Sequence, residues 1–467
     1  MENPSPLERV QNLWPQLIIP RNLAYRSVGE DVFCWRLGTG IEDRFAIVGG
    51  VGVDAFAAIE KQAGLDRLLD AVTERYGVSL DEVVDGLEQF LLAAIAAGLF
   101  AKCGPTHQAV TAHALPVGTG EEPSEEDVLD TMFEKASAAA IPLKAILELT
   151  HQCNNRCQHC YLGLSIGVPP RPAMSTSRQI ELMEEMAAAG VLELVLSGGE
   201  PMLHPEFARL LQRASELHFA IGLLTNGTRL DKDMVELLAS VPLDHVRVPI
   251  YGLEEYHNRF VRNAHAFQQT WQGILALYAR GVPVSATSTL THENSHDLLE
   301  IKWRLDEVGV PFHVGPLVYS TIQHDETPTR HRATHDQLRA MVTGLDIKMR
   351  RSRCTAGVSR FRISPDGYLH PCEMLSDICF GNLEQDSFEA VLQSPVRQQW
   401  IGRFRSYMQA KDDSGCHECS ARPHCVDCVG LSYLESGSFS SRCQQACQFA
   451  HTLAYFEECN AMFAELT

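Results

Sequence analysis

Apolar runs alternate with helical patterns from residue 141 to about residue 320, and this alternation constrains the fold more than any other feature. The segments between the runs, such as SRQIELMEEMAAAG, repeat apolar residues at helical spacing. Repeated βα units predict an α/β fold with a parallel sheet, open or closed into a barrel, and its active site at the carboxyl ends of the strands. The predicted strands are 143–149, 192–197, 219–225, 245–250, 283–291 and 311–319.

The cysteines are concentrated in two stretches. Of the fifteen, Cys153, Cys157 and Cys160 follow the first predicted strand, none occurs from 161 to 353, and ten follow from 354 onward. The opening MENPSPLERV does not resemble a secretory signal, so we expect a cytoplasmic location. In such a reducing compartment, clustered thiols indicate metal binding or catalysis rather than disulfides.

The first thiol group has the spacing Cys-x3-Cys-x2-Cys and lacks a fourth cysteine nearby. Three thiolates can hold three irons of a cubane cluster and leave one iron open to a ligand. A structural zinc site is the alternative, although zinc prefers four ligands and His159, the residue that could complete the set, lies between two of the thiols. Three unrelated thiols are the other alternative.

With His159 before the third cysteine, this motif resembles that of the radical S-adenosylmethionine (SAM) enzymes. The resemblance implies a partial (β/α)6 TIM-like barrel and a 4Fe–4S cluster on the three thiols. It implies SAM on the open iron and a 5′-deoxyadenosyl radical that abstracts hydrogen from a substrate.

Later segments of the barrel extend the resemblance. Gly198, Gly199, Glu200 and Pro201 are similar to the family's SAM-amino motif, although alone they could be a strand-to-helix turn. Asn226 could orient ligand groups or form a simple Asn-Gly turn.

The fourth strand departs from the family pattern. Pro249 stands where relatives often carry a ribose-binding Ser, and Arg262 and the segment TSTLT are weaker candidates for that contact. The sequence identifies no catalytic acid or base.

The second cysteine group resembles the SPASM extension of radical SAM enzymes, which carries two auxiliary 4Fe–4S clusters and brings the total to three. The resemblance implies one cluster on Cys354, Cys372 and Cys428, completed by Cys379 or left open. The other would be held by Cys416, Cys419, Cys425 and Cys443, with Cys447 as a competitor for Cys443. A zinc ribbon on residues 416, 419, 425 and 428 is the alternative.

The amino-terminal residues 17–103 form a small unit of two predicted strands, 22–37 and 42–50, and three helices, which fits a winged-helix module. It resembles the peptide chaperone of pyrroloquinoline quinone biosynthesis, a PqqD-like domain. The resemblance implies that a precursor-peptide leader adds as a strand beside Arg44 to Val48, against the helix of Val83 to Phe90. DNA binding is the alternative, which the acidic stretch DEVVDGLEQ disfavours.

Composition limits the partners. The net charge of −20 argues against a nucleic-acid surface, and no apolar run reaches the roughly 18 residues of a membrane span. The predicted units are the module (17–103), a linker ending in a helix near 125–138 (104–140), the barrel (141–330), the SPASM domain (350–450) and a final helix (451–467).

These observations lead to one main hypothesis, a radical SAM maturase of a ribosomal peptide that forms a C–S or C–C crosslink, or an epimer, with flavodoxin or ferredoxin as reductant. The alternatives are a radical SAM enzyme for a tetrapyrrole or other small molecule, one for a folded protein as in sulfatase maturation, and a non-catalytic iron–sulfur peptide carrier.

Overall fold

A parallel sheet forms the centre of the computed structural model, which describes residues 4–37, 44–102, 125–163, 172–345, 352–411, 415–416 and 418–464. Its six parallel strands follow one another in sequence order, β6 to β11, as the alternation of apolar runs predicts. The strands are β6 (Lys144–Glu148), β7 (Glu193–Ser197), β8 (Ala220–Leu224), β9 (Leu243–Pro249), β10 (Val284–Thr289) and β11 (Phe312–Gly315).

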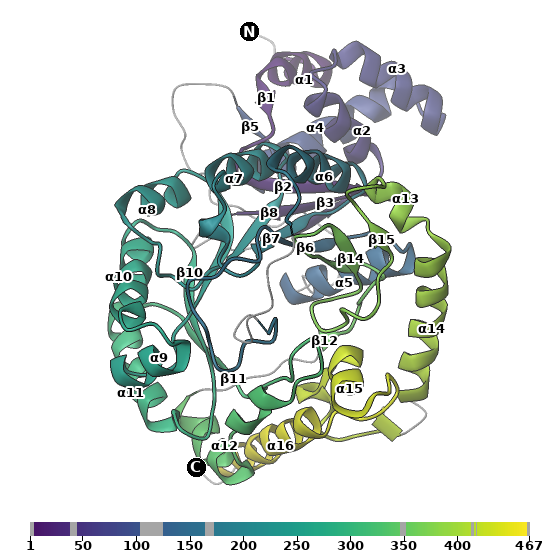
Figure 1. Ribbon diagram of the computed structural model, residues 1–467. Helices are drawn as coiled ribbons and strands as arrows, with labels where there is room; N and C mark the ends of the chain where they lie inside the picture. Colours follow the sequence, from purple (N-terminus) through teal and green to yellow (C-terminus); the bar gives the residue numbers. More distant parts are fainter. Residues whose placement is uncertain are drawn as a thin grey trace.

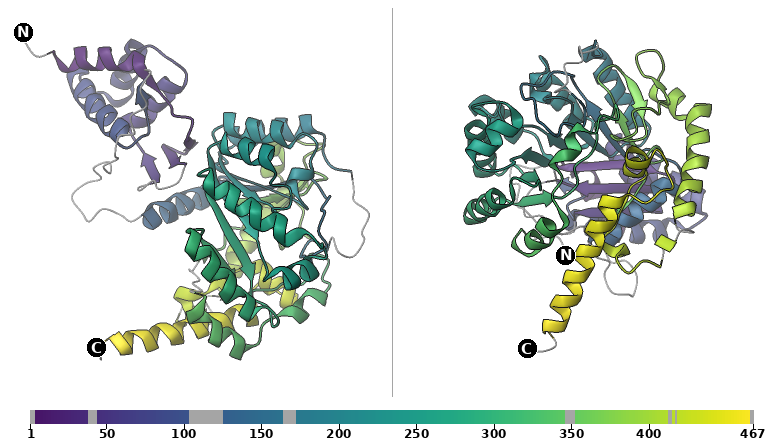
Figure 2. Two further views of the ribbon diagram at one scale, coloured as in Figure 1. Left: turned by 90° about the vertical axis from the view of Figure 1, so that its left-hand side faces the viewer. Right: turned by 60° about the horizontal axis from the view of Figure 1, so that its bottom comes forward.

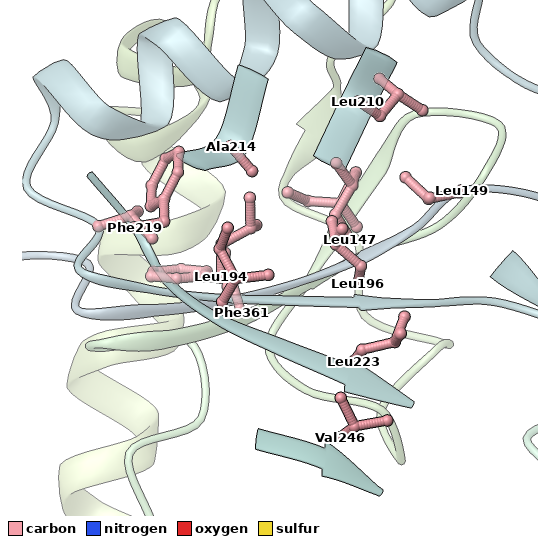
Figure 3. Packing of buried hydrophobic residues seen from close by; sticks show 14 of the residues in the cluster. Leu147, Leu149, Leu194, Leu196, Leu210, Ala214, Phe219, Leu223, Val246 and Phe361 are labelled. Carbon is pink, nitrogen blue, oxygen red and sulfur yellow. The ribbon is translucent and has the colours of Figure 1, made fainter. Parts of the chain in front are cut away.

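Helices connect these strands and cover the outer, convex face of the sheet (Figure 1). They are α6 (Thr176–Ala188), α7 (Phe207–Glu216), α8 (Lys232–Ala239), α9 (Glu254–Val261), α10 (Ala266–Ala279) and α11 (Ser295–Val308). Alternate strand residues such as Leu147, Leu194 and Leu223 belong to one apolar cluster with Leu210 and Ala214 of α7 (Figure 3). The intervening residues therefore face the concave side.

The sheet extends beyond the predicted barrel. Strand β13 (Arg360–Ile363) pairs parallel with β6, and the antiparallel strands β14 (Tyr368–His370) and β15 (Gly381–Asn382) complete the order β11-β10-β9-β8-β7-β6-β13-β14-β15. The first part of the predicted SPASM unit is thus continuous with the barrel sheet, because β13 supplies the backbone partners of β6. Among the described residues no strand pairs with the outer edge of β11, so this sheet is open rather than closed.

Among the remaining carboxyl-terminal elements, α13 and α14 share the main apolar cluster with Phe361 of β13, on the helix-covered side of the sheet. Helices α12, α15 and α16 lie at the end of the molecule opposite the amino-terminal module (Figures 1 and 2). The final helix begins before the predicted residue 451 and carries Cys447 in its first turn. These elements are α12 (His335–Gly344), β12 (Ser352–Arg353), α13 (Phe388–Leu392), α14 (Pro395–Lys411), β16 (Val426–Asp427), α15 (Val429–Ser436) and α16 (Gln444–Ala464).

The amino-terminal module has three antiparallel strands in the order β2-β3-β4, one more than predicted. Gly29, with φ of 64°, and Glu30 form the turn that splits the first predicted strand into a hairpin. Helix α1 was not predicted, whereas Ser79 caps α4 as expected. The elements are α1 (Pro6–Leu13), β1 (Leu17–Ile18), β2 (Leu23–Val28), β3 (Asp31–Arg36), β4 (Phe45–Val48), α2 (Val51–Glu60), α3 (Leu65–Tyr76), α4 (Leu80–Ala96) and β5 (Ala101–Lys102).

The module docks at the amino ends of the barrel strands, away from the loops that follow those strands. One apolar cluster joins Phe33 and Trp35 of β3 to Met132 of α5 (Glu125–Ala138) and to Leu192 and Ala220, at the starts of β7 and β8. Helix α5 is the helix predicted near 125–138, and most of the predicted linker lies outside the described residues. Within the described ranges, no helix is both long and apolar enough to cross a bilayer.

Candidate metal centres

The first thiol group lies in the loop after β6, at the carboxyl edge of the sheet. Two backbone hydrogen bonds fix this loop to the end of α9, from Arg156 N to Val261 O (2.9 Å) and from Gln158 N to Phe260 O (3.0 Å). Cys153, Cys157 and Cys160 are all partly exposed, and none of the three forms a disulfide. The structure therefore places the three predicted thiols on one anchored loop, where each is partly exposed.

The thiols lie close enough to affect one another's protonation. Burial raises the pKa of Cys153 and of Cys157, and the charge of Cys160 raises both pKa values further. Three such thiols resist ionising together unless a cation binds them. This donor set fits a thiolate-ligated iron–sulfur cluster with one exposed side.

His159 lies among aromatic rings, where it packs without joining the thiols. Its ring centroid is 4.6 Å from that of Tyr251 and 4.9 Å from that of Phe260, and burial lowers its pKa to about 4. The residue that could have completed a zinc site is thus half-buried and packs against the rings of Tyr251 and Phe260. This packing disfavours the zinc alternative.

Gly198 and Gly199 let the loop after β7 approach the first thiol loop closely. Gly198 has φ of 133°, and a Cβ there would lie 2.6 Å from Thr150 O; a Cβ on Gly199 would overlap Gln152 O. Gly199 N donates to Thr150 O (2.9 Å) and Glu200 N to Gln152 O (2.7 Å). The glycines thus permit backbone contact between two loops, in addition to any approach to a ligand.

The Glu200 carboxylate is fully buried and points into the protein. Its Oε1 accepts hydrogen bonds from Met202 N (3.2 Å) and Thr225 Oγ1 (2.8 Å), and its Oε2 accepts one from Asn226 N (2.7 Å). Burial raises its pKa to about 7 and outweighs the hydrogen bonds, which lower it. Glu200 therefore joins the loops after β7 and β8, a role that the sequence did not predict.

Asn226 connects the loop after β8 to the first thiol loop. Its Nδ2 donates to Asn154 Oδ1 (2.8 Å) and lies 3.9 Å from Cys153 Sγ, while its Oδ1 accepts from Thr228 N (2.9 Å). Gly227 follows with φ of 77°, so the Asn-Gly turn is also present. Pro201 begins a short 3-10 turn after Glu200.

The first auxiliary set converges through strand pairing. Strand β12 pairs parallel with β16, which places Cys354 and Cys428 side by side at the ends of these strands. A hydrogen bond with Cys428 lowers the pKa of Cys354 to about 7. A Cβ placed on Gly430 would lie 3.5 Å from Cys372 Sγ, so the third thiol lies here too.

The contacts of Cys379 are with a different segment from the one that holds Cys354, Cys372 and Cys428. Its Sγ donates to Gly381 O (3.3 Å), in the segment of β14 and β15, and burial raises its pKa. Of the two predictions for the fourth position, this placement favours the open one.

The second auxiliary set lines a cavity of about 310 Å³. Five thiols face it, those of Cys416, Cys419, Cys425, Cys443 and Cys447. Cys428 belongs with Cys354 instead, which separates the four members of the alternative zinc ribbon. Among the residues that the structure describes, no three His, Cys, Asp or Glu side chains are grouped for a single metal ion.

Two groups near the thiols were not singled out from the sequence. His451 Nε2 lies 3.7 Å from Cys419 Sγ. Arg362 forms a buried two-pronged ion pair with Glu148 (2.9 and 2.7 Å) on the concave side of the sheet. In the segment RFRI, Arg360 and Arg362 alternate with the apolar Phe361 and Ile363. This alternation could have predicted from the sequence that one face of β13 is polar.

Comparison with known proteins defines the class. Residues 147–302 match the family model of the radical SAM superfamily, and residues 354–420 match SPASM, an iron–sulfur cluster-binding domain. These matches contain the first thiol loop and the start of the auxiliary thiols. The chain therefore contains a radical SAM domain followed by a SPASM domain.

Individual relatives are distant. The sporulation killing factor maturation protein SkfB of Bacillus subtilis is 26% identical over 55% of this chain and 66% of its own length. The pre-heme d1 synthase of Dinoroseobacter shibae is 31% identical over 38% of this chain and 43% of its own length. The chain therefore matches no more than about two thirds of either relative's length.

One solved protein shares the fold over most of the chain. Crystal structures of Streptococcus suis SuiB bound to S-adenosylmethionine and to the precursor peptide SuiA have TM-scores of 0.59 and 0.60. They cover 92% of this chain and 99% and 100% of SuiB, at 14% and 15% identity. This likeness shows a common fold, including the region of the amino-terminal module.

Proposed function

We propose that the chain matures a ribosomally made precursor peptide. The leader binds the module of residues 17–103, and the core of the peptide lies on the concave side of the barrel. With its cluster and SAM bound, the site supplies a 5′-deoxyadenosyl radical that abstracts hydrogen from a carbon of the peptide. The product is a C–S or C–C crosslink, or an epimer, and flavodoxin or ferredoxin supplies the electron.

The edge of the module sheet carries this proposal. Within the described residues, β4 has β3 as a hydrogen-bonded neighbour on one side and no strand on the other. Both faces of the sheet are covered, since Ile47 packs toward α5 and Val48 toward α2 and α4. An edge strand between covered faces can accept a peptide as a further strand. The PqqD-like reading of the module is part of this proposal.

The proposal assigns the SAM cluster, the SAM site and the two auxiliary clusters to particular residues. Cys153, Cys157 and Cys160 hold the SAM cluster, and Gly198 to Pro201 with Asn226 frame the SAM site. Cys354, Cys372 and Cys428 hold one auxiliary cluster with an open fourth position. The thiols of the 310 Å³ cavity hold the other.

Coexpression with each short reading frame beside the gene tests the function. The expected result is one peptide whose mass falls by two hydrogens per crosslink, or that gains a D-residue without a change of mass. Replacing Cys153, Cys157 and Cys160 by Ala should abolish the change. A modification that survives this triple replacement, or no modified peptide in any pairing, contradicts the proposal.

Iron analysis tests the number of clusters separately. Three cubanes predict about twelve irons per reconstituted chain. The triple Ala variant should retain about eight, and a wild-type value near four would contradict both auxiliary assignments.

Small-molecule chemistry on a tetrapyrrole is the second candidate, favoured by the similarity to pre-heme d1 synthase. The match covers 38% of the chain, and a small-molecule substrate would not require a peptide-binding module. Conversion of a tetrapyrrole by the full chain, with no neighbouring peptide modified, would favour this candidate over peptide maturation.

A further inference from the structure

The concave face of β9, β10 and β11 is polar and accessible. Strand residues alternate between a buried set facing the helices, such as Val246 and Val248, and a partly exposed set facing the concave side. The concave set comprises His245, Arg247, Pro249, Ser285, Thr287, Thr289, His313 and Gly315. In a filled barrel such positions pack together, so their exposure marks an open surface.

Arg247 differs from the other charged groups on this side of the sheet. Lys144 pairs with Glu193, Arg360 with Glu373, and Arg362 with Glu148. Arg247 is exposed, and no carboxylate of the described residues pairs with it. An unpaired cation in a chain of net charge −20 is a site for an anion from outside.

The neighbours of Arg247 supply further hydrogen-bonding groups. The parallel register sets Ser285 beside Arg247, and Thr287 beside both Pro249 and His313. Burial lowers the pKa of His313 and the charge of Arg247 lowers it further, so the imidazole is a neutral donor beside the guanidinium. A guanidinium, two hydroxyls and an imidazole form a surface suited to a carboxylate.

Arg247 lies between the module and the first thiol loop. At the start of β9, Asp244 forms an ion pair with Arg44 of the module. Beyond its end, Tyr251 packs on His159 of the thiol loop. By strand rise, Arg247 is about 10 Å from Asp244 and about 13 Å from Tyr251 along the chain. A peptide held by the module and reacting at the thiol loop passes this position.

We propose that Arg247, with Ser285, Thr287 and His313, binds a carboxylate of the substrate peptide, either an Asp or Glu side chain or the free carboxyl terminus. The inference rests on the proposed function, because it takes the concave face as the place of the peptide. Arg247 is a binding and specificity residue, and the chemistry at the thiol loop does not involve it.

Affinity selection from a random synthetic peptide library tests this site. Half of the library peptides have a free carboxyl terminus and half are carboxyl-amidated. The library is passed over immobilised, reconstituted holoenzyme in the presence of SAM. The retained peptides are then sequenced by mass spectrometry. Wild type should retain Asp- and Glu-containing or free-acid peptides about tenfold over neutral ones. Enrichment that requires the free-acid half identifies the terminus, and enrichment in the amidated half identifies a side chain.

Two replacements and one control complete the design. Arg247→Gln should abolish the enrichment, and Arg247→Glu should shift it to Lys and Arg. The control Arg304→Gln, which removes an exposed arginine paired with Glu300 on α11, should leave it unchanged. Melting temperatures and SAM affinity of all variants are measured in parallel to show that each is folded and loaded.

Three results overturn the inference. The first is that wild type shows no preference for acidic peptides, and the second is that the preference survives in Arg247→Gln. The third is that Arg247→Gln loses affinity for SAM, which would assign the site to the SAM carboxylate. Acid enrichment without any modified neighbouring peptide contradicts the proposed function alone. A modified peptide without acid enrichment contradicts this inference alone.

Discussion

Glu200 shows how a motif residue acts in the folded chain. Its position suggested a contact with the SAM amino group, whereas its carboxylate accepts three hydrogen bonds that join the loops after β7 and β8. A buried acid with three donors is subject to two opposing effects, since burial favours its neutral form and the donors favour its charged form.

We predict that Glu200→Gln lowers the stability by about 1–3 kcal/mol, because an amide NH2 would face donors. The folded pKa of about 7 lies above the usual 4.5, so the folded state binds the proton more tightly. The stabilisation that the acid contributes is therefore complete below pH 4.5 and is lost as pH rises toward 7. The advantage of wild type over Glu200→Gln should shrink between pH 5 and pH 8.

Urea unfolding midpoints of the metal-free protein at the two pH values measure this advantage. A difference that grows with pH would show that the donors outweigh burial and that the pKa of Glu200 lies below its usual range.

We predict that Gly199→Ala disturbs the first thiol loop, because its Cβ would overlap the Gln152 carbonyl oxygen and backbone cannot move aside cheaply. The variant should lose SAM cleavage and part of its iron. The matched control is Gly402→Ala on α14, where a Cβ meets nothing within 4 Å. This replacement should raise helix stability by about 1 kcal/mol. Equal iron content and activity in both variants would contradict the packing argument.

At the scale of elements, helix α16 brings two thiols to one cavity. Cys443 directly precedes the helix and Cys447 lies one turn later, so both face the same side. Sequence spacing left these two residues as competitors, and the cavity admits both.

We predict that Cys443→Ala and Cys447→Ala each retain the second auxiliary cluster, because the remaining thiol is one turn away. The double variant should lose about four irons per chain. Iron and sulfide analysis with electron paramagnetic resonance of the reduced protein measures this. Loss of the cluster in one single variant would identify that residue as the ligand.

Strand pairing leads to a second prediction at this scale. Cys372→Ala should lose the first auxiliary cluster, whereas Cys379→Ala should keep it, because Cys379 bonds to Gly381 O in the β14–β15 segment. The same iron analysis distinguishes them. A similar loss in both variants would return Cys379 to the ligand set.

At the scale of the whole molecule, the module and the thiol loop lie at opposite ends of the barrel strands. Arg26 of β2 fixes this arrangement, since it is buried and donates to the carbonyls of Leu217 (2.7 Å) and His218 (3.2 Å) after α7. Its guanidinium also lies 4.6 Å from the centre of the Phe219 ring. Under the proposed function, a precursor bound to β4 extends along the concave face to reach the thiol loop.

We predict that Arg26→Ala costs about 3 kcal/mol, because it removes several charged hydrogen bonds and leaves buried carbonyls without donors. Amide hydrogen exchange should accelerate in β2 and at the end of α7. The control Arg75→Ala breaks an exposed ion pair with Asp54 and should cost no more than about 1 kcal/mol. Unchanged exchange in Arg26→Ala would show that the apolar cluster alone holds the module.

The sequence predicted the elements well where their signal is local. Six strands and their helices follow from alternating apolar patterns, and Ser79 was identified as a cap from its neighbours. The hairpin at Gly29 was missed because two short strands with one tight turn carry the same composition as one long strand.

The sequence by itself determined the parallel βα sheet, the three-thiol loop after its first strand and the cysteine-rich character of the carboxyl-terminal part, because each depends on residue types at short spacing. Only the tertiary structure decided that His159 packs against Tyr251 and Phe260, that Glu200 points inward, and that no carboxylate of the described residues pairs with Arg247. These features depend on contacts between segments far apart in the chain, and spacing along a sequence carries no information about which distant strands pair or which charges meet.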